Sequence, residues 1–145
     1  MSILIHYPYK KYKIIEWLKV KKLIRDIISQ YGKKPGNINY IFIDNEEILK
    51  LNCQYLRHNY PTDVMCFILD DNNKISGDIY VGIETVIENS IIYNVSLENE
   101  LMRVVVHGTL HLCGVEDSND EEREIMKKNE DYWLEKAVSY YGIPL

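Results

Sequence analysis

The segment His107 to Asp117, with the sequence HGTLHLCGVED, holds the residues whose types and spacing could do chemistry. His107 and His111 are four residues apart, so a helical period of 3.6 residues places both imidazole rings on one face. Gly114 can end that helix in a left-handed conformation, and Asp117 follows where the returning chain could supply a third ligand. Two nitrogens and one carboxylate oxygen, with a position open for water, describe a catalytic zinc site, because structural sites are closed by four protein ligands.

A structural role is the alternative reading of this histidine pair, because histidines on an apolar helix are often core residues that hydrogen-bond to carbonyls. Only four histidines occur in the chain, and two of them fall within one helical turn. The surrounding segment 101–112 is otherwise strongly apolar, so unpaired imidazoles there would be costly. These features favour metal binding. Cys113, two residues past His111 and therefore on a different face, is expected to fill apolar space rather than to act as a fourth ligand.

The pattern HxxxHxxGxxD also shares its outline with metzincin proteases, in which a glutamate after the first histidine acts as general base. Gly108 occupies that place here, so peptide hydrolysis lacks its usual base and is the less favoured function. Glu116, beside the predicted ligand Asp117, is the nearby carboxylate that could have a chemical role, with simple surface exposure as the alternative.

The positive charge is concentrated at the start of the chain. Residues 1–36 hold nine lysines and arginines against two acidic residues, although the whole chain carries a net charge of −5. An amphipathic helix predicted over residues 10–31 places Lys19, Lys22 and Arg25 on its outer face, where they could bind RNA phosphates. A solvated face that only keeps the protein soluble is the alternative.

The length and composition of the chain predict one domain spanning residues 1–145. Hydrophobic residues make up 46% and charged residues 27%, which is typical of a globular protein. No apolar run approaches the roughly 18 residues of a membrane helix, and the first residues lack the order of a signal peptide. We therefore expect a cytoplasmic protein without a membrane partner, with its three scattered cysteines reduced.

Hydrophobic periodicity and turn residues predict the elements that must position the histidines. The fold class is α+β (α/β), a single domain with a small mixed four-stranded sheet, surrounding helices and the metal site on a central buried helix and the loop after it. We expect strands at 2–6 (an edge strand), 39–43, 63–69 (a central strand covered on both faces) and 77–81, the last two paired antiparallel. We expect helices at 10–31, after Asp44, at 83–93, at 97–113 with Ser96 as cap, and at 118–141. The breaker cluster 32–37 ends the first of them. The apolar positions of the last helix are Ile125, Met126, Tyr132, Trp133, Ala137 and Tyr140.

Three segments in this order resemble the YbeY family of bacterial metal-dependent endoribonucleases. They are LNCQYLRHNYPTDVMCF (51–67), SGDIYV (76–81) and HGTLHLCG (107–114), and they span roughly the middle half of the chain. The resemblance implies one α/β domain with a divalent ion held by three side chains of the last motif. It further implies hydrolysis of single-stranded RNA, in 3′-end maturation of 16S ribosomal RNA and in ribosome quality control, with ribosomal RNA or the small ribosomal subunit as partner.

Two positions depart from the family pattern. The family motif ends in tyrosine, aspartate and a third histidine, whereas this chain has Val115, Glu116 and Asp117, so an oxygen donor replaces a nitrogen donor. We expect one divalent ion per chain, zinc in the first place, with manganese or nickel as alternatives. The arginine that usually follows the tyrosine directly is replaced by Leu56, and Arg57 comes one residue later.

The leading hypothesis is a metal-dependent, single-strand-specific endoribonuclease. In it His107 and His111 are the catalytic metal ligands with Asp117, and Arg57 stabilises the negative charge that develops on the phosphate. Lys19, Lys22, Arg25 and Arg57 are the candidate RNA-binding residues. A non-catalytic, ribosome-associated binding module, in which the metal clamps the helix to the following loop, is the second hypothesis, and a metzincin-like protease is the third.

Overall fold

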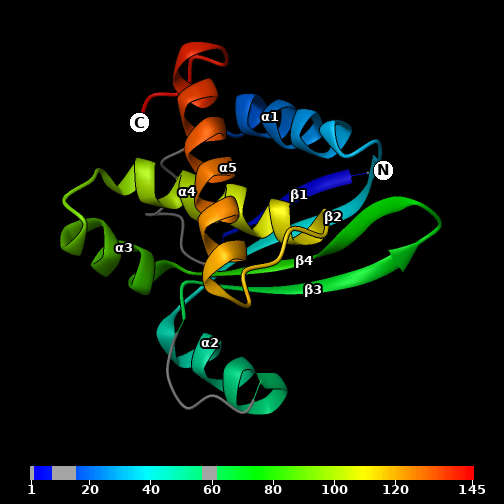
Figure 1. The fold of residues 1–145 in the computed structure, drawn as a ribbon. Helices are drawn as coiled ribbons and strands as arrows, with labels where there is room; N and C mark the ends of the chain where they lie inside the picture. The colour runs from blue at the N-terminus through cyan, green and yellow to red at the C-terminus, as the bar shows by residue number, and fades with distance from the viewer. Residues whose placement is uncertain (1, 8–15, 57–61) are drawn as a thin grey trace.

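The computed structural model of the chain describes residues 2–7, 16–56 and 62–145. Within them the strands form one mixed sheet in the order β1-β2-β4-β3 (Figure 1). β1 pairs parallel with β2, β2 parallel with β4, and β3 antiparallel with β4. The strand bounds are β1 (Ser2–His6), β2 (Lys34–Ile43), β3 (Val64–Asp71) and β4 (Lys74–Gly82). The expected α+β fold with a small four-stranded mixed sheet is confirmed.

Helix α4 is the central helix of the fold. The helical elements among the described residues are α1 (Trp17–Gln30), α2 (Asn45–Leu51), the π-helix η2 (Asn52–Leu56), α3 (Ile83–Ile92), α4 (Leu97–Leu112) and α5 (Asp120–Ser139). α4 contacts strands β3 and β4 on one side and helices α1, α3 and α5 around it. Figure 1 shows α5 passing across α4, while α2 lies apart at the opposite side of the sheet. A side chain near the end of α4 therefore lies where the sheet and α5 meet.

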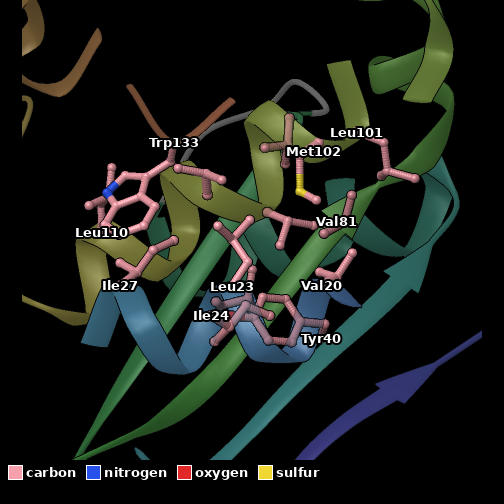
Figure 2. Close-up of a cluster of buried hydrophobic side chains, with 14 of the residues drawn as sticks. Val20, Leu23, Ile24, Ile27, Tyr40, Val81, Leu101, Met102, Leu110 and Trp133 are labelled. Atoms are coloured by element: carbon pink, nitrogen blue, oxygen red, sulfur yellow. The ribbon is translucent and has the colours of Figure 1, made fainter. Parts of the chain in front are cut away.

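The main core fills the space between the sheet and the helices α1, α4 and α5 (Figure 2). Leu23 and Ile27 of α1, Leu101 of α4 and Val81 of β4 are fully buried there. Each such side chain contributes roughly 1.5–3 kcal/mol by leaving water. The core keeps α4 in one position against the sheet, and with it the histidines that α4 carries.

Gly108 sets how closely α4 approaches the sheet. A Cβ atom at this position would lie 2.9 Å from Cγ2 of Ile79 on β4, so a larger residue would push the helix outward. Tyr40 of β2 reaches the same region, and its hydroxyl lies 2.6 Å from Oγ1 of Thr109. Because residue 108 faces the sheet, His107 and His111 are turned toward the rim of the core.

Two sheet predictions were wrong. β3 is an edge strand and not a central one, and its Ile68 and Leu69 are 64% and 55% exposed. Apolar residues on both faces of this strand indicate burial only if another strand lies outside it, and strand order is set by distant parts of the chain. β2 begins at Lys34, inside the predicted breaker cluster, because a register shift between Pro35 and Ile38 accommodates the proline in the sheet.

The predicted edge strand, antiparallel β3–β4 pair and helix caps are confirmed. β1 lies at one edge of the sheet. Asp44 Oδ1 accepts a hydrogen bond from the Glu47 backbone N–H at 2.9 Å, and Ser96 Oγ accepts one from that of Asn99 at 3.0 Å. The helix predicted from residue 10 is described only from Trp17, since 8–15 lie outside the described residues.

The final predicted helix starts and ends inside its expected bounds, with Asn119 as its N-cap. Its apolar face was only partly correct: Met126, Trp133 and Ala137 are buried, whereas Ile125, Tyr132 and Tyr140 are exposed. The buried face of this helix packs against α4, and the charged residue Glu130 lies on that face. In the parts of the chain that the structure describes, no helix combines the length and apolarity needed to cross a membrane.

Candidate metal centre

The three predicted ligands meet at the end of α4. The rings of His107 and His111 are partly buried, with centroids 4.5 Å apart. Gly114, at φ +96°, ends the helix and turns the chain back, so that Asp117 returns toward the histidines. Oδ2 of Asp117 lies 3.4 Å from Nε2 of each ring, and one ligand atom from each of the three residues lies within 4.8 Å of the other two.

The hydrogen bonds at the far side of each ring direct both Nε2 atoms toward this meeting point. His111 Nδ1 lies 2.9 Å from the Val115 carbonyl oxygen, which can only accept, so the ring donates from Nδ1 and keeps a lone pair on Nε2. His107 Nδ1 lies 2.6 Å from Oε2 of Glu130, an arrangement in which a carboxylate accepts from the ring of a metal-binding histidine. Each ring thus presents Nε2 toward Asp117.

The donor set fits a divalent cation. Two imidazole nitrogens and one carboxylate oxygen converge on one point, and each of these atom types offers a lone pair to a metal ion when it carries no proton. A cation between these groups would be stabilised by the charge of Asp117 and by both nitrogen lone pairs. The ligand types match those of catalytic zinc sites with three protein ligands.

Glu130 and Arg103 are parts of this centre that the sequence reasoning missed. Glu130 of α5 is only 7% exposed, and its Oε1 accepts a hydrogen bond from Arg103 Nη1 at 2.9 Å. Arg103 Nη2 also donates to Oδ1 of Asp131 at 2.7 Å. Burial lowers the pKa of His107, but the hydrogen bond and charge of Glu130, together with the charges of Asp117 and Asp63, outweigh burial, so the pKa is raised. A signal existed in the sequence, because Glu130 is spaced in register with Met126, Trp133 and Ala137 on the buried face of α5.

A cavity of about 490 Å³ opens onto the three ligands, between α4 and the start of β3. Asp63 lines it, and burial raises the pKa of this carboxyl group, although the charge of His107 partly opposes that rise. Sequence reasoning gave Asp63 no chemical role, because a single acidic residue before a strand has no distinguishing spacing. Cys66 also lines the cavity, and burial raises the pKa of its thiol to about 12, so it stays protonated.

The remaining candidate residues lie elsewhere or outside the described residues. Cys113 is buried in the main core, as expected for an apolar filler. Glu116 is exposed. On α1, Lys22 and Arg25 are exposed, whereas Lys19 forms an ion pair with Glu16 at 2.9 Å and donates to the Gly142 carbonyl at 3.1 Å. Arg57 falls in 57–61, which the structure does not describe.

Comparisons with known proteins agree over most of the chain. A family model described as Endoribonuclease YbeY matches residues 6–138. A Parabacteroides distasonis protein named Endoribonuclease YbeY is 43% identical over 122 residues, which cover 84% of this chain and 82% of the relative. A Flavobacterium johnsoniae protein of the same name is 46% identical over 105 residues, covering 72% and 76%. The solution structure of TM1509 from Thermotoga maritima superposes with a TM-score of 0.68 at 26% identity, covering 97% of this chain and 92% of that one.

Proposed function

The chain belongs to the YbeY family, and on that premise we propose that it is a metal-dependent endoribonuclease that cleaves single-stranded RNA. The single observation that supports the metal centre is the convergence of two Nε2 atoms and one Oδ2 atom beside a cavity. Family membership also confirms the resemblance seen in the three sequence segments.

We assign one divalent ion to His107, His111 and Asp117, zinc in the first place, with manganese or nickel as alternatives because Asp117 is an oxygen donor. When bound, such an ion supplies Lewis acidity and a water molecule of lowered pKa. The ligand types support this assignment, because nitrogen and carboxylate donors suit all three ions.

The protein's own groups orient this centre. Glu130 and the Val115 carbonyl hold the Nδ1 protons of the two rings, so both Nε2 atoms face the cavity. Arg103 donates to Glu130 and Asp131, which holds the Glu130 carboxylate in position beside His107. His107 therefore depends on contacts from α5 as well as on its own helix.

Two further residues are assigned to the reaction. Asp63 lies in the same cavity, partly shielded from water, and is placed to accept the proton that the attacking water loses. Arg57, outside the described residues, is assigned to the negative charge that develops on the phosphate, as the neighbouring family motif implies.

The basic residues of α1 are assigned to the RNA backbone. Lys22 and Arg25 are exposed, so their charges are available to phosphates, and Lys19 is the least available because it pairs with Glu16. We propose ribosomal RNA of the small subunit as the substrate, with maturation of the 16S 3′ end and ribosome quality control as the roles and the cytoplasm as the location. These last assignments rest on what the family resemblance implies.

The proposed activity is tested by incubating the purified chain with a labelled single-stranded RNA and with the same strand in a duplex. We expect cleavage of the single strand alone, loss of cleavage after chelation, and recovery when zinc or manganese is added. Cleavage that continues after elemental analysis shows the chain to be free of metal would overturn the metal-dependent mechanism.

A further inference from the structure

A second cavity, of about 550 Å³, lies between α1 and α5 and has a different lining from the metal centre. We call it the α1–α5 cavity. Its α5 side and the turn after it supply aromatic rings and one lysine, and its α1 side supplies the carboxylate of Asp26, the hydroxyl of Ser29 and the amide of Gln30. Among the described residues, none that lines it has an aliphatic side chain. The volume is in the range of small-molecule sites.

The α5 side of this cavity is a ridge of exposed aromatic rings around a cation. Tyr132, Lys136 and Tyr140 are four residues apart in turn and lie on one face of the helix. The Lys136 ammonium lies 5.8 Å from the centroid of each tyrosine ring. Tyr132 and Tyr140 are 47% and 67% exposed. These rings offer flat apolar surface beside a positive charge.

The rings are held in position by edge-to-face contacts with neighbouring aromatic residues. Tyr132 meets Trp133 at a centroid distance of 5.1 Å, and Tyr140 meets Tyr141 at 4.9 Å. The hydroxyl of Tyr141 donates a hydrogen bond to Asp26 on α1, which ties the two walls of the cavity together. The cavity is therefore formed before any ligand arrives.

The α1 wall adds the groups that a nucleotide would need. Ser29 and Gln30 line the cavity with a hydroxyl and an amide, which can both donate to and accept from the edge of a base. Lys22 lies one helical turn before Asp26 and is exposed, as is Arg25. Aromatic rings next to basic side chains that follow a backbone are the combination that binds single-stranded nucleic acid.

We propose that the α1–α5 cavity binds an unpaired nucleobase of the RNA strand, stacked on Tyr132 or Tyr140, with Lys136 and Lys22 near the adjoining phosphates. The proposal rests on the proposed function, to which it adds a base-binding subsite away from the metal. Lys136 follows Glu130 by six residues, which is about 9 Å along the α5 axis. A strand bound in the cavity would thus lie along the helix that also supports the metal centre.

The test measures RNA affinity in the full chain carrying His111→Ala, so that cleavage cannot interfere. The probes are a short labelled oligoadenylate and a labelled abasic strand of equal length. Fluorescence anisotropy measures the binding of each probe. In this background Tyr132→Ala with Tyr140→Ala should weaken oligoadenylate binding about tenfold. The matched pair Tyr132→Phe with Tyr140→Phe keeps the rings and should stay within about twofold. Val138→Ala, exposed on the same helix, controls for side-chain removal.

The abasic strand separates stacking from charge, and should bind the parent and the alanine pair equally. Equal affinity of the parent and the alanine pair for oligoadenylate would overturn the subsite, as would absence of RNA binding by the parent. A different result is an alanine pair that binds oligoadenylate as the parent does but no longer binds a protein of the assembled small ribosomal subunit. That result would assign the cavity to a protein partner. Tyrosine-dependent binding by a chain that never cleaves RNA would uphold the subsite while the proposed function fails.

Discussion

The carboxylate of Glu130 lies 2.6 Å from Nδ1 of His107, although 23 residues separate them in the chain. This contact joins α5 to the face of α4 that carries His107 and His111, and it fixes which nitrogen of His107 faces the cavity. Arg103 in turn donates a hydrogen bond to Glu130, so His107, Glu130 and Arg103 form one hydrogen-bonded chain.

Replacing Glu130 tests this connection. Glu130→Ala removes the acceptor of the His107 ring proton, and metal affinity should fall about 10- to 100-fold. Glu130→Gln keeps an oxygen that can accept, so its loss should be smaller. Zinc titration against a competing chelator measures both variants. Glu135→Gln, an exposed change on the same helix, is the control, and equal affinity of Glu130→Ala and this control would show that the contact does not matter.

The identity of the third ligand is tested at Asp117. Asp117→Ala should lose most bound metal, whereas Asp117→His, which places the family's usual donor at this position, should retain it. Because nitrogen donors suit zinc and nickel better than manganese, the histidine variant should also shift the preference away from manganese. Elemental analysis after exposure to an equimolar mixture gives the ratio. A normal metal content in Asp117→Ala would exclude this residue as a ligand.

Salt dependence tests the role of α1 in binding RNA. The slope of log K against log salt is negative, and each phosphate contact that is removed should make it less steep by about 0.7 for a single strand. Lys22→Ala with Arg25→Ala should therefore weaken binding at low salt and reduce that slope. Lys128→Ala on α5, which pairs with Glu124 at 4.0 Å, serves as the control. The idea fails if the double variant keeps the parent slope.

Close packing at Gly108 should make this position intolerant even of alanine. The new Cβ would lie 2.9 Å from Cγ2 of buried Ile79, and overpacking of this kind costs about 1–3 kcal/mol. The better helix propensity of alanine offsets about 1 kcal/mol of that cost, so the net loss in unfolding free energy should be about 1 kcal/mol. Urea unfolding measures it. In a double-mutant cycle, Gly108→Ala with Ile79→Ala should lose less stability than the sum of the two single variants, because removal of the Ile79 side chain relieves the clash. Unchanged stability of Gly108→Ala would contradict the packing argument.

Local sequence signals account for much of the fold and for part of the site. A few neighbouring residues are enough to predict the spacing of His107 and His111 on one helix, the N-cap at Ser96 and the turn at Gly114. The structure contains each of these features. The order of the strands depends on contacts between distant segments, which is why β3 was misplaced at the centre of the sheet.

The same limit explains the missed parts of the site. The spacing of Glu130 with the buried residues of α5 indicates that it faces the core, but nothing in the sequence around either residue records that α5 crosses α4 beside His107. The exposed Tyr132 and Tyr140 were assigned to the buried face of α5 because tyrosine counts as apolar in a periodicity argument. Tyrosine is amphipathic, so its position had to come from the structure.

The most direct test of the metal centre is the metal content of the purified parent chain and of His111→Ala, measured by elemental analysis together with RNA cleavage. The ring of His111 contributes one of the three converging ligand atoms. We expect one divalent ion per parent chain, and neither bound ion nor cleavage in a folded His111→Ala variant. A variant that keeps both its ion and its nuclease activity would contradict the assignment of the centre to His107, His111 and Asp117.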